Sequence, residues 1–282
     1  MFAANILAAA TPATVVQQPY AHMAREAVLP EADYAALAAT FPDSATILGG
    51  RTGRENSAAR LPAFKVLDNP AIAPAWRDFF AFHTSQAFWS EIVRVFAPSL
   101  REALPGLEAN AGRPMEEWTA APRGTRDEAD VRLECQFVIN TPARHASSVK
   151  TQHVDKRNTI LALLLYFRDP ADHAGGGDFE VYAWKRAPRF LPFQRMILPD
   201  DLALQRVVKY APNTLAAFVN SPQAAHGVSP RDPSELPRRY INFIVETPFK
   251  AFDIAEIGLA ERIFYWPKMR KLGLRSVGDE LY

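Results

Sequence analysis

The amino-acid sequence predicts a mainly β protein whose β region is flanked by helices on both sides along the chain. Apolar residues recur at helical spacing between about residues 73 and 96. From residue 131 the apolar period changes to two, as expected for a half-buried strand. Further short strand candidates follow up to residue 246, and turn signals separate them. This order indicates a sandwich or barrel and not a parallel α/β sheet.

The first segment, residues 1–16, is predicted to be a loose tail. It is apolar and rich in alanine, but it lacks the Lys or Arg that begins a signal peptide. A short helix is expected after Pro30, because Glu31 and Asp33 place carboxylates in its first turn, where the helix dipole favours them. This helix should end before Phe41, which a proline follows.

An aromatic stripe marks the longest helical signal. Its members are Trp76, Phe79, Phe80, Phe82, Phe88, Trp89, Ile92, Val93 and Phe96. An amphipathic helix needs such a face to pack on a core, so a core role is favoured over a ligand-binding role. We therefore expect residues 17–125 to be mainly helical and to pack outside the β core.

The β core is expected to span residues 126–250. After a first strand near residues 131–140, the predicted strands are Thr159–Phe167, Phe179–Trp184, Gln205–Tyr210, Thr214–Val219 and Arg239–Glu246. From about residue 254 to 274 the pattern is helical again, with an interruption at Pro267, so residues 251–282 are predicted to form C-terminal helices. Residues 17–282 are expected to form a single domain.

The composition excludes several classes of function. Thirty-two Lys and Arg residues against 31 Asp and Glu give a net charge of +1, and no basic block suggests a nucleic-acid partner. No apolar run approaches the roughly 18 residues of a membrane span. The single cysteine, Cys135, excludes an intrachain disulfide and a cysteine-rich zinc cluster, which predicts a protein of the reducing cytoplasm. A metal site would therefore use His and carboxylate ligands.

The candidate metal ligands are His153, Asp155 and His226. On an extended chain, residues i and i+2 point to the same side with roughly 6–7 Å between their Cα atoms, so His153 and Asp155 can share one ion. His226 opens the segment that follows a predicted strand and a turn. Two histidines and one carboxylate can occupy one face of a metal octahedron and leave three positions free. Such a triad suits iron(II), which must bind both a cosubstrate and dioxygen.

In these features the sequence resembles the iron(II)- and 2-oxoglutarate-dependent dioxygenases, in particular their prolyl-hydroxylase-like branch. The resemblance covers roughly residues 131–246 and rests on four motifs in order, which are His153-Val-Asp155, Gly176-Gly177-Asp-Phe-Glu-Val-Tyr, His226-Gly-Val and Arg239-Tyr240. It implies a double-stranded β-helix core of the jelly-roll, cupin-like kind. It also implies Fe(II), 2-oxoglutarate and dioxygen as reactants, with hydroxylation of a C–H bond and release of succinate and carbon dioxide.

A basic residue near the start of the last strand is expected to bind the far carboxylate of 2-oxoglutarate. Arginine suits this role because its planar fork donates two parallel hydrogen bonds and stays charged when buried. We prefer Arg239, which alternates with Ile241 and Phe243 on an apolar face suited to line a barrel. Arg238 shares its face with Tyr240 and a polar residue, and it stays an alternative.

The sequence departs from the family pattern at the second cosubstrate contact. Branch members often have a tyrosine on the strand after the His-x-Asp pair, but alignment places Leu165 there with Tyr166 next to it, so this contact stays open. The gap from His226 to Arg239 is also longer than in compact members. Asp155 argues against the halogenating subgroup, which has a small residue at that position.

The substrate is not defined by the sequence. We expect an unidentified small molecule, a sugar or glycan, or a biosynthetic intermediate, and the oligomeric state stays open. The insertion at residues 185–203 and a basic flank of Lys150, Lys156 and Arg157 could favour an anionic metabolite or sugar, although a solvated surface explains these charges equally well. The alternatives are a non-catalytic β-sandwich binding protein and a zinc-dependent hydrolase that uses the same three residues.

Overall fold

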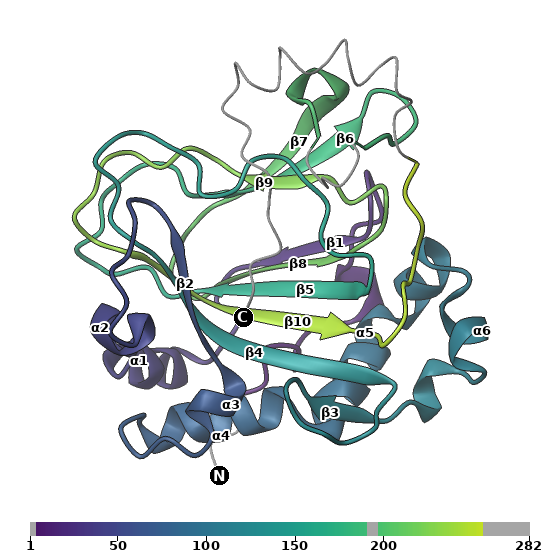
Figure 1. Ribbon diagram of the computed structural model, residues 1–282, viewed down its shortest axis with the longest axis horizontal. Helices are drawn as coiled ribbons and strands as arrows, with labels where there is room; N and C mark the ends of the chain where they lie inside the picture. Colours follow the sequence, from purple (N-terminus) through teal and green to yellow (C-terminus); the bar gives the residue numbers. More distant parts are fainter. Residues whose placement is uncertain (1–3, 191–196, 256–282) are drawn as a thin grey trace.

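The computed structural model describes residues 4–190 and 197–255, which form two facing β-sheets with helices packed on the outer side of the larger sheet (Figure 1). The predicted C-terminal helices fall almost entirely in residues 256–282, outside the described part of the chain. No helix within the described ranges is long and apolar enough to cross a membrane.

The larger sheet has seven strands within the described residues. Its order is β1-β8-β5-β10-β4-β2, with β3 beside β4. The strands are β1 (His22–Arg25), β2 (Ala58–Pro62), β3 (Ala120–Pro122), β4 (Val131–Asn140), β5 (Thr159–Tyr166), β8 (Thr214–Val219) and β10 (Arg238–Glu246). All neighbours are antiparallel except β3 and β4. Strands β1, β2 and β3 are not among the strands that the sequence predicts.

The smaller sheet has the order β7-β6-β9, with β6 (Phe179–Trp184), β7 (Leu202–Val208) and β9 (His226–Val228). An antiparallel bridge between His153 and His226 adds the segment before β5 to its edge. The chain thus passes from β4 to the smaller sheet at His153, back to β5, on to β6 and β7, back to β8, and then through β9 to β10. This repeated crossing between sheets is the double-stranded β-helix that the resemblance implied, and the prediction is confirmed.

The described helices belong mainly to the first half of the chain. They are α1 (Glu31–Ala39), α2 (Ser44–Leu48), α3 (Ala63–Val66), α4 (Pro74–His83), α5 (Gln86–Ala103) and α6 (Leu107–Ala111), with short 3₁₀ turns at Pro12–Thr14, Met115–Glu117 and Pro199–Asp201. The helix predicted after Pro30 is confirmed as α1. The long helical signal at residues 73–96 is split into α4 and α5, because Ser85 caps a new helix by accepting a hydrogen bond from the Phe88 N–H at 3.4 Å.

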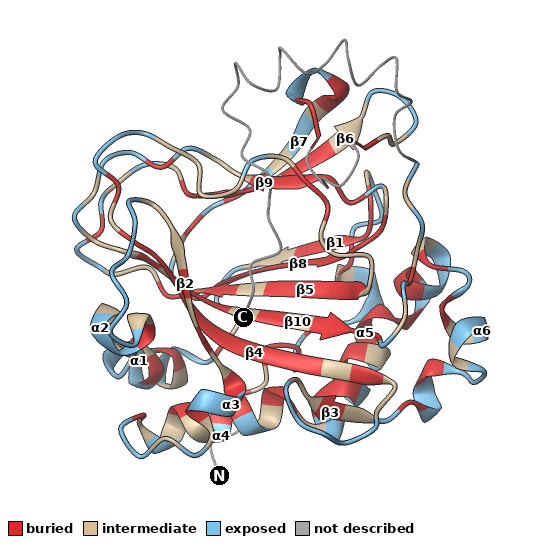
Figure 2. Ribbon diagram, in the orientation of Figure 1, coloured by how far each residue is buried: buried red, intermediate tan, exposed pale blue. Residues whose placement is uncertain are grey.

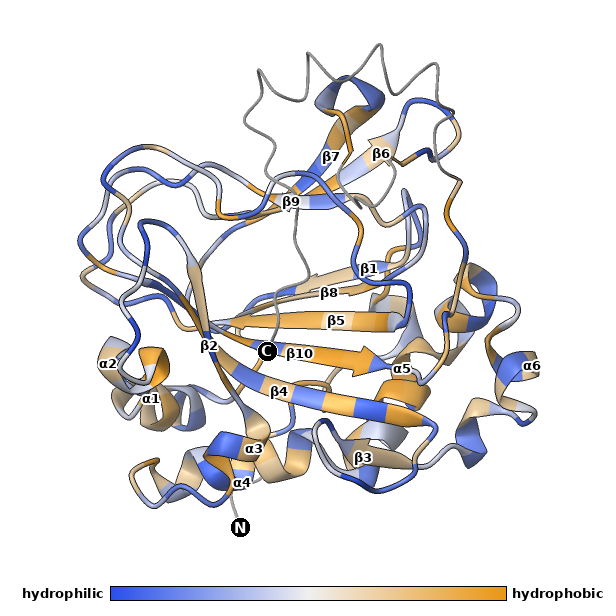
Figure 3. Ribbon diagram, in the orientation of Figure 1, coloured by the Kyte–Doolittle hydropathy of each residue, from blue (hydrophilic) through white to orange (hydrophobic). Residues whose placement is uncertain are grey.

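The outer core lies between the helices and the larger sheet. The ring of Trp76 on α4 packs against that of Phe137 on β4 with centroids 4.7 Å apart, and Phe79 packs against Phe243 at 6.1 Å. The core role predicted for the aromatic stripe is therefore confirmed. Figure 2 shows β5 and β10 buried over most of their length, and Figure 3 shows β5 largely hydrophobic along its length.

A second core fills the space between the two sheets. Its buried members are Tyr20, Val138, Ala162, Tyr166, Phe179, Val181, Val208, Tyr210, Ala216, Phe218, Ala224 and Tyr240. Because side chains alternate along a strand, β10 turns Tyr240 to this inner core and Ile241 and Phe243 to the outer core. The expectation that Ile241 and Phe243 line the barrel interior is therefore wrong.

The prediction of a loose tail at residues 1–16 is also wrong for the part described. Ile6, Leu7 and Ala10 are 0% exposed and belong to the outer core. Arg94 of α5 holds the segment by donating hydrogen bonds to the carbonyl oxygens of Ala10 at 2.7 Å and Leu7 at 2.9 Å. The segment packs in an irregular conformation, so it has no helical or strand period from which burial could be read.

Replacing Leu7 by alanine should lower the free energy of unfolding by about 2–5 kcal/mol, because a buried leucine is lost and a cavity remains. Val16→Ala is the matched control: Val16 is 45% exposed, and its replacement should change that free energy by no more than about 0.5 kcal/mol. Denaturant unfolding measures both values. Equal, small effects of the two substitutions would show that the N-terminal segment is loose in solution.

Candidate metal centre and anion pocket

His153 and His226 face each other across the edge of the smaller sheet. Each backbone N–H donates to the carbonyl oxygen of the other residue at 2.9 Å. Directly opposed residues of an antiparallel pair point to the same face, and the two imidazole rings lie with centroids 4.1 Å apart. The backbone pairing therefore fixes the relative position of the two histidines.

The hydrogen bonds of the two rings define which nitrogen carries the proton. The Nδ1 atom of His153 lies 2.7 Å from the carbonyl oxygen of Thr151, and that of His226 lies 2.9 Å from the carbonyl oxygen of Ala224. A carbonyl oxygen can only accept, so in both neutral rings Nδ1 is the donor and Nε2 carries a lone pair. This tautomer presents Nε2 as a metal ligand.

Both Nε2 atoms are directed at the carboxylate of Asp155. The distances are 3.4 Å from His153 Nε2 to Asp155 Oδ1 and 3.8 Å from His226 Nε2 to Asp155 Oδ2. Ligand atoms of the three residues all lie within 4.8 Å of one another. Two lone pairs and a negative charge repel one another unless a cation lies between them, so the arrangement fits a divalent metal.

The pKa values of the triad favour the ligand forms. Burial lowers the pKa of His153 well below its usual value, and the charge of Lys150 and the ring of His226 add to this. For Asp155 burial acts in the opposite direction, but Lys150 and the two imidazoles outweigh it and hold the pKa well below its usual range. At neutral pH the imidazole of His153 is therefore neutral and the carboxylate of Asp155 is ionised, as metal binding requires.

Asn220, which the sequence analysis did not identify, holds the segment that carries Asp155. Its Oδ1 accepts a hydrogen bond from the Asp155 N–H at 3.2 Å, and its Nδ2 donates to the carbonyl oxygens of Lys156 at 2.9 Å and Thr159 at 2.8 Å. Lys150 also donates to Asp155 Oδ1 at 3.1 Å. The position of Asn220 directly after a predicted strand gave a weak signal, since a buried strand end seldom carries an amide without a role.

Arg238 lies deep in the space between the sheets, with 1% of its surface exposed. Its Nε donates to the carbonyl oxygen of Gly177 at 2.7 Å and its Nη1 to Asn140 Oδ1 at 3.1 Å. The guanidinium carbon lies 4.9 Å from the ring centroid of Tyr166 and 4.6 Å from that of Tyr240. Arg238 is thus the inward arginine of β10.

Arg239 points to the opposite face of β10, so the preference for Arg239 over Arg238 is corrected by the structure. Its Nε donates to the carbonyl oxygen of Phe167 at 3.0 Å, and its Nη2 forms an ion pair with Asp169 Oδ2 at 3.2 Å. Its guanidinium lies over the ring of Phe41. The physical reason is that Ile241 and Phe243, which share a face of β10 with Arg239, pack on the helices and do not line the interior.

Several buried donors around Arg238 have no hydrogen-bond acceptor among the described residues. They are Arg238 Nη2, Asn140 Nδ2 and the Tyr166 hydroxyl, with Gln136 Nε2 and the Tyr20 hydroxyl elsewhere on the inner face. Burial raises the pKa of Tyr166 to about 12, so its hydroxyl keeps its proton and can donate. Unsatisfied buried donors are rare in folded proteins. A cluster that offers a cation and donors is suited to an anion. Tyr166 faces this cluster, whereas Leu165 lies in the outer core.

The paired glycines of the sequence motif let Arg238 and the loop before β10 approach the backbone closely. A Cβ atom at Gly177 would lie 3.1 Å from the Cδ atom of Arg238, and Gly177 has a φ of +73°. A Cβ atom at Gly176 would lie 1.8 Å from the carbonyl oxygen of Pro230. Only glycine accommodates both the positive φ and the close approach at these positions.

Comparisons with known proteins give matches to solved structures. No family model matches the chain, and no curated protein matches it. A prolyl-4-hydroxylase from Pseudomonas putida aligns with a TM-score of 0.47 and 14% identity over 86% of this chain and 100% of that one. A rice dioxygenase for auxin oxidation aligns with a TM-score of 0.43 and 14% identity over 91% and 87%. A shared activity does not follow from matches at this level.

Removing any one of the three candidate ligands should abolish tight metal binding. Cobalt(II), titrated as a spectroscopic substitute for iron(II), should bind the His153→Ala, Asp155→Ala and His226→Ala variants more weakly by at least about 100-fold, because even outer-shell changes cost 10–100-fold. His145→Ala is the control, since the His145 side chain is 84% exposed. Full cobalt affinity in the His226→Ala variant would exclude the three-ligand site.

Proposed function

We propose that this protein is an iron(II)- and 2-oxoglutarate-dependent oxygenase that hydroxylates a C–H bond. The observation that carries the proposal is the pairing of two features on one inner face. One is the convergence of two imidazole lone pairs and a carboxylate, which fits a divalent metal. The other is the buried pocket of donors around Arg238, which fits a carboxylate. A short diacid that binds the metal with one end and the donors around Arg238 with its other end needs both features.

The spacing of the two features supports the proposal. Along β5, Tyr166 at the anion pocket and Ala162 are four residues apart, about 13 Å on an extended strand. Ala162 pairs with Phe218 of β8, whose ring lies 4.2 Å from that of His226. A short diacid with metal bonds at one end and hydrogen bonds at the other can span this distance.

In this proposal His153, Asp155 and His226 hold iron(II) and leave coordination positions open. Bound iron(II) supplies the activation of dioxygen, which is consumed with 2-oxoglutarate to give succinate, carbon dioxide and a hydroxylated substrate. Two neutral imidazoles and one carboxylate contribute a ligand charge of only −1, so a dianionic cosubstrate is not repelled strongly.

The other residues position the cosubstrate and exclude water. Arg238 and Tyr166 would donate hydrogen bonds to the distal carboxylate, while Asn140 Oδ1 and the Gly177 carbonyl oxygen hold the guanidinium in place. The aromatic rings of Tyr166, Tyr210 and Tyr240 surround the guanidinium, with their centroids 4.6–5.0 Å from its central carbon. A low-polarity surrounding of this kind strengthens the charge-assisted bonds.

Gln136 and Tyr20 carry donor groups on the inner face that the cosubstrate would not use. They favour a substrate with oxygen acceptors, consistent with the expected small metabolite, sugar or biosynthetic intermediate.

Anaerobic titration with iron(II) and 2-oxoglutarate tests the proposal. Chelation should produce a weak visible charge-transfer band, and admission of air should release succinate and carbon dioxide in equal amounts. A non-catalytic binding protein would give no band. A zinc-dependent hydrolase would be active with zinc and show no requirement for 2-oxoglutarate.

Arg238→Gln should raise the Kd for 2-oxoglutarate by about tenfold to a hundredfold, because hydrogen bonds to charged groups contribute roughly 1.5–3 kcal/mol each. The Kd of the Arg238→Lys variant should lie between those of the wild type and the Arg238→Gln variant, since an ammonium keeps the charge but lacks the planar fork. Arg239→Gln is the matched control on the opposite face and should leave this Kd within about twofold. The charge-transfer band reports each Kd. A defect in the Arg239 variant without one in the Arg238 variant would reverse the assignment.

Tyr166→Phe should raise the same Kd by about threefold to thirtyfold, because one hydroxyl donor to a carboxylate is lost. Tyr34→Phe is the control. The Tyr34 ring stacks on Phe167 and its hydroxyl donates to the Tyr166 carbonyl oxygen at 3.4 Å, outside the pocket. An unchanged Kd in the Tyr166 variant would remove this residue from the cosubstrate site.

A further inference from the structure

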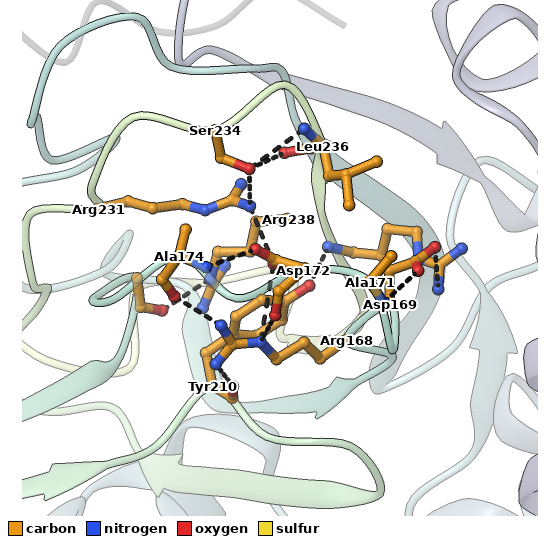
Figure 4. A network of polar contacts seen from close by, with 12 residues as sticks. Arg168, Asp169, Ala171, Asp172, Ala174, Tyr210, Arg231, Ser234, Leu236 and Arg238 are labelled. Carbon is orange, nitrogen blue, oxygen red and sulfur yellow. Dashed lines mark hydrogen bonds and ion pairs between the residues drawn. The ribbon is translucent and has the colours of Figure 1, made fainter.

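A second buried guanidinium, that of Arg231, lies beside Arg238 (Figure 4). Arg231 belongs to the loop between β9 and β10, and only 3% of its side chain is exposed. Two backbone hydrogen bonds fix the position of this loop residue. The Arg231 N–H donates to the carbonyl oxygen of Ser147 at 2.9 Å, and the Ser147 N–H donates back at 3.2 Å.

The hydrogen bonds of Arg231 use one of its three nitrogen atoms. Nη2 donates to Asp172 Oδ2 at 2.9 Å and to Ser234 Oγ at 3.1 Å. Nε and Nη1 are buried and have no acceptor within the described ranges. An arginine that is withdrawn from water normally satisfies its donors, so this geometry indicates an acceptor that belongs to a ligand.

Arg231 and Arg238 pack against the same glycine. A Cβ atom at Gly177 would lie 3.1 Å from Arg238 Cδ and 3.6 Å from Arg231 Cδ. The two side chains also lie next to each other in Figure 4. Arg231 therefore contributes its charge to the end of the pocket where Arg238 has its unsatisfied Nη2.

The charges at this end of the pocket do not balance. Arg231 shares its carboxylate partner, Asp172, with Arg168, and no ion pair within the described residues neutralises the buried guanidinium of Arg238. Asp178 lies near Tyr166 but is already paired with Lys209 at 2.9 Å. A buried excess of positive charge is costly without a counter-ion, so the cluster favours a bound anion.

Arg168 differs from Arg231 in the same network. Its Nε, Nη1 and Nη2 donate to the carbonyl oxygens of Asp172 at 2.9 Å, Tyr210 at 3.1 Å and Ala174 at 2.5 Å. Each of its three nitrogens thus has an acceptor in the protein itself. Arg168 stabilises the loop, and it provides a matched control for Arg231.

We propose that Arg231 is the second cation of the anion pocket and selects a ligand whose far end is a carboxylate. This inference rests on the proposed function and extends it, since it adds a specificity-determining residue from a loop that the sequence motifs do not include. A 2-oxo acid with a neutral far end gains nothing from Arg231, whereas 2-oxoglutarate gains a second charge-assisted contact.

The test compares 2-oxoglutarate with 2-oxobutyrate, which chelates in the same way but ends in a methyl group. Each acid is titrated anaerobically into the iron(II) protein, and the ratio of the two Kd values measures the selectivity. Arg231→Gln should reduce this selectivity at least about tenfold through the Kd of 2-oxoglutarate alone, as expected for one charge-assisted contact. Arg168→Gln should lower the melting temperature and leave the ratio unchanged.

Arg231→Lys keeps the charge and serves if the glutamine variant does not fold. It should reduce the selectivity at least about threefold, because the ammonium lacks the fork. An unchanged ratio in a folded Arg231 variant, or equal losses of affinity for both acids, would overturn the proposal and leave the proposed function intact. A wild-type protein that forms no band with either acid would overturn both.

Discussion

The two-residue alternation of side chains along β10 is the constraint on which the rest of the structure depends. This strand lies between β4 and β5 at the centre of the larger sheet. Its inward residues, Arg238 and Tyr240, build the wall of the anion pocket, and its outward residues, Ile241 and Phe243, pack on the helices. A shift of one residue would exchange the two sets and place apolar side chains in the pocket. The outer core therefore fixes the inward position of Arg238.

The candidate metal site depends on a different and more local constraint. The reciprocal backbone hydrogen bonds between His153 and His226 join two segments that are far apart in the chain, and Asn220 holds the backbone of Asp155 beside them. Tyr20 belongs to the same region, because its ring lies next to that of Phe218 with centroids 6.5 Å apart. The segment before it packs on the opposite side of the larger sheet, in the outer core.

The parts of the fold with a regular period could be predicted from the sequence. Strands β4, β5, β6, β8 and β10 and helix α1 match their expected positions closely, because each carries a clear alternation or a clear start signal. The short edge strand β1 and the irregular N-terminal residues have no such period. The triad could be found because a His-x-Asp pair and a later histidine are local motifs in a fixed order.

The face of β10 could not be predicted, for a physical reason. The alternation along β10 predicts that its apolar face lines the barrel, but both faces of this central strand are covered, and the apolar face packs on the helices. The side of β10 that faces the smaller sheet carries Arg238 and Tyr240 instead. For the same reason the alignment puts Leu165 at the position of the family tyrosine, although Leu165 lies in the outer core and Tyr166 in the inner one. Arg231 was missed because a loop arginine has no pattern that reveals burial.

A crystal structure of the protein grown anaerobically with iron(II) and 2-oxoglutarate tests the central claim most directly. Anomalous scattering at the iron absorption edge should place one metal between His153, Asp155 and His226. The distal carboxylate of the cosubstrate should lie against the guanidinium of Arg238 and the hydroxyl of Tyr166. An iron site elsewhere, or a cosubstrate whose distal carboxylate contacts Arg239 on the helix side of β10, would contradict the account.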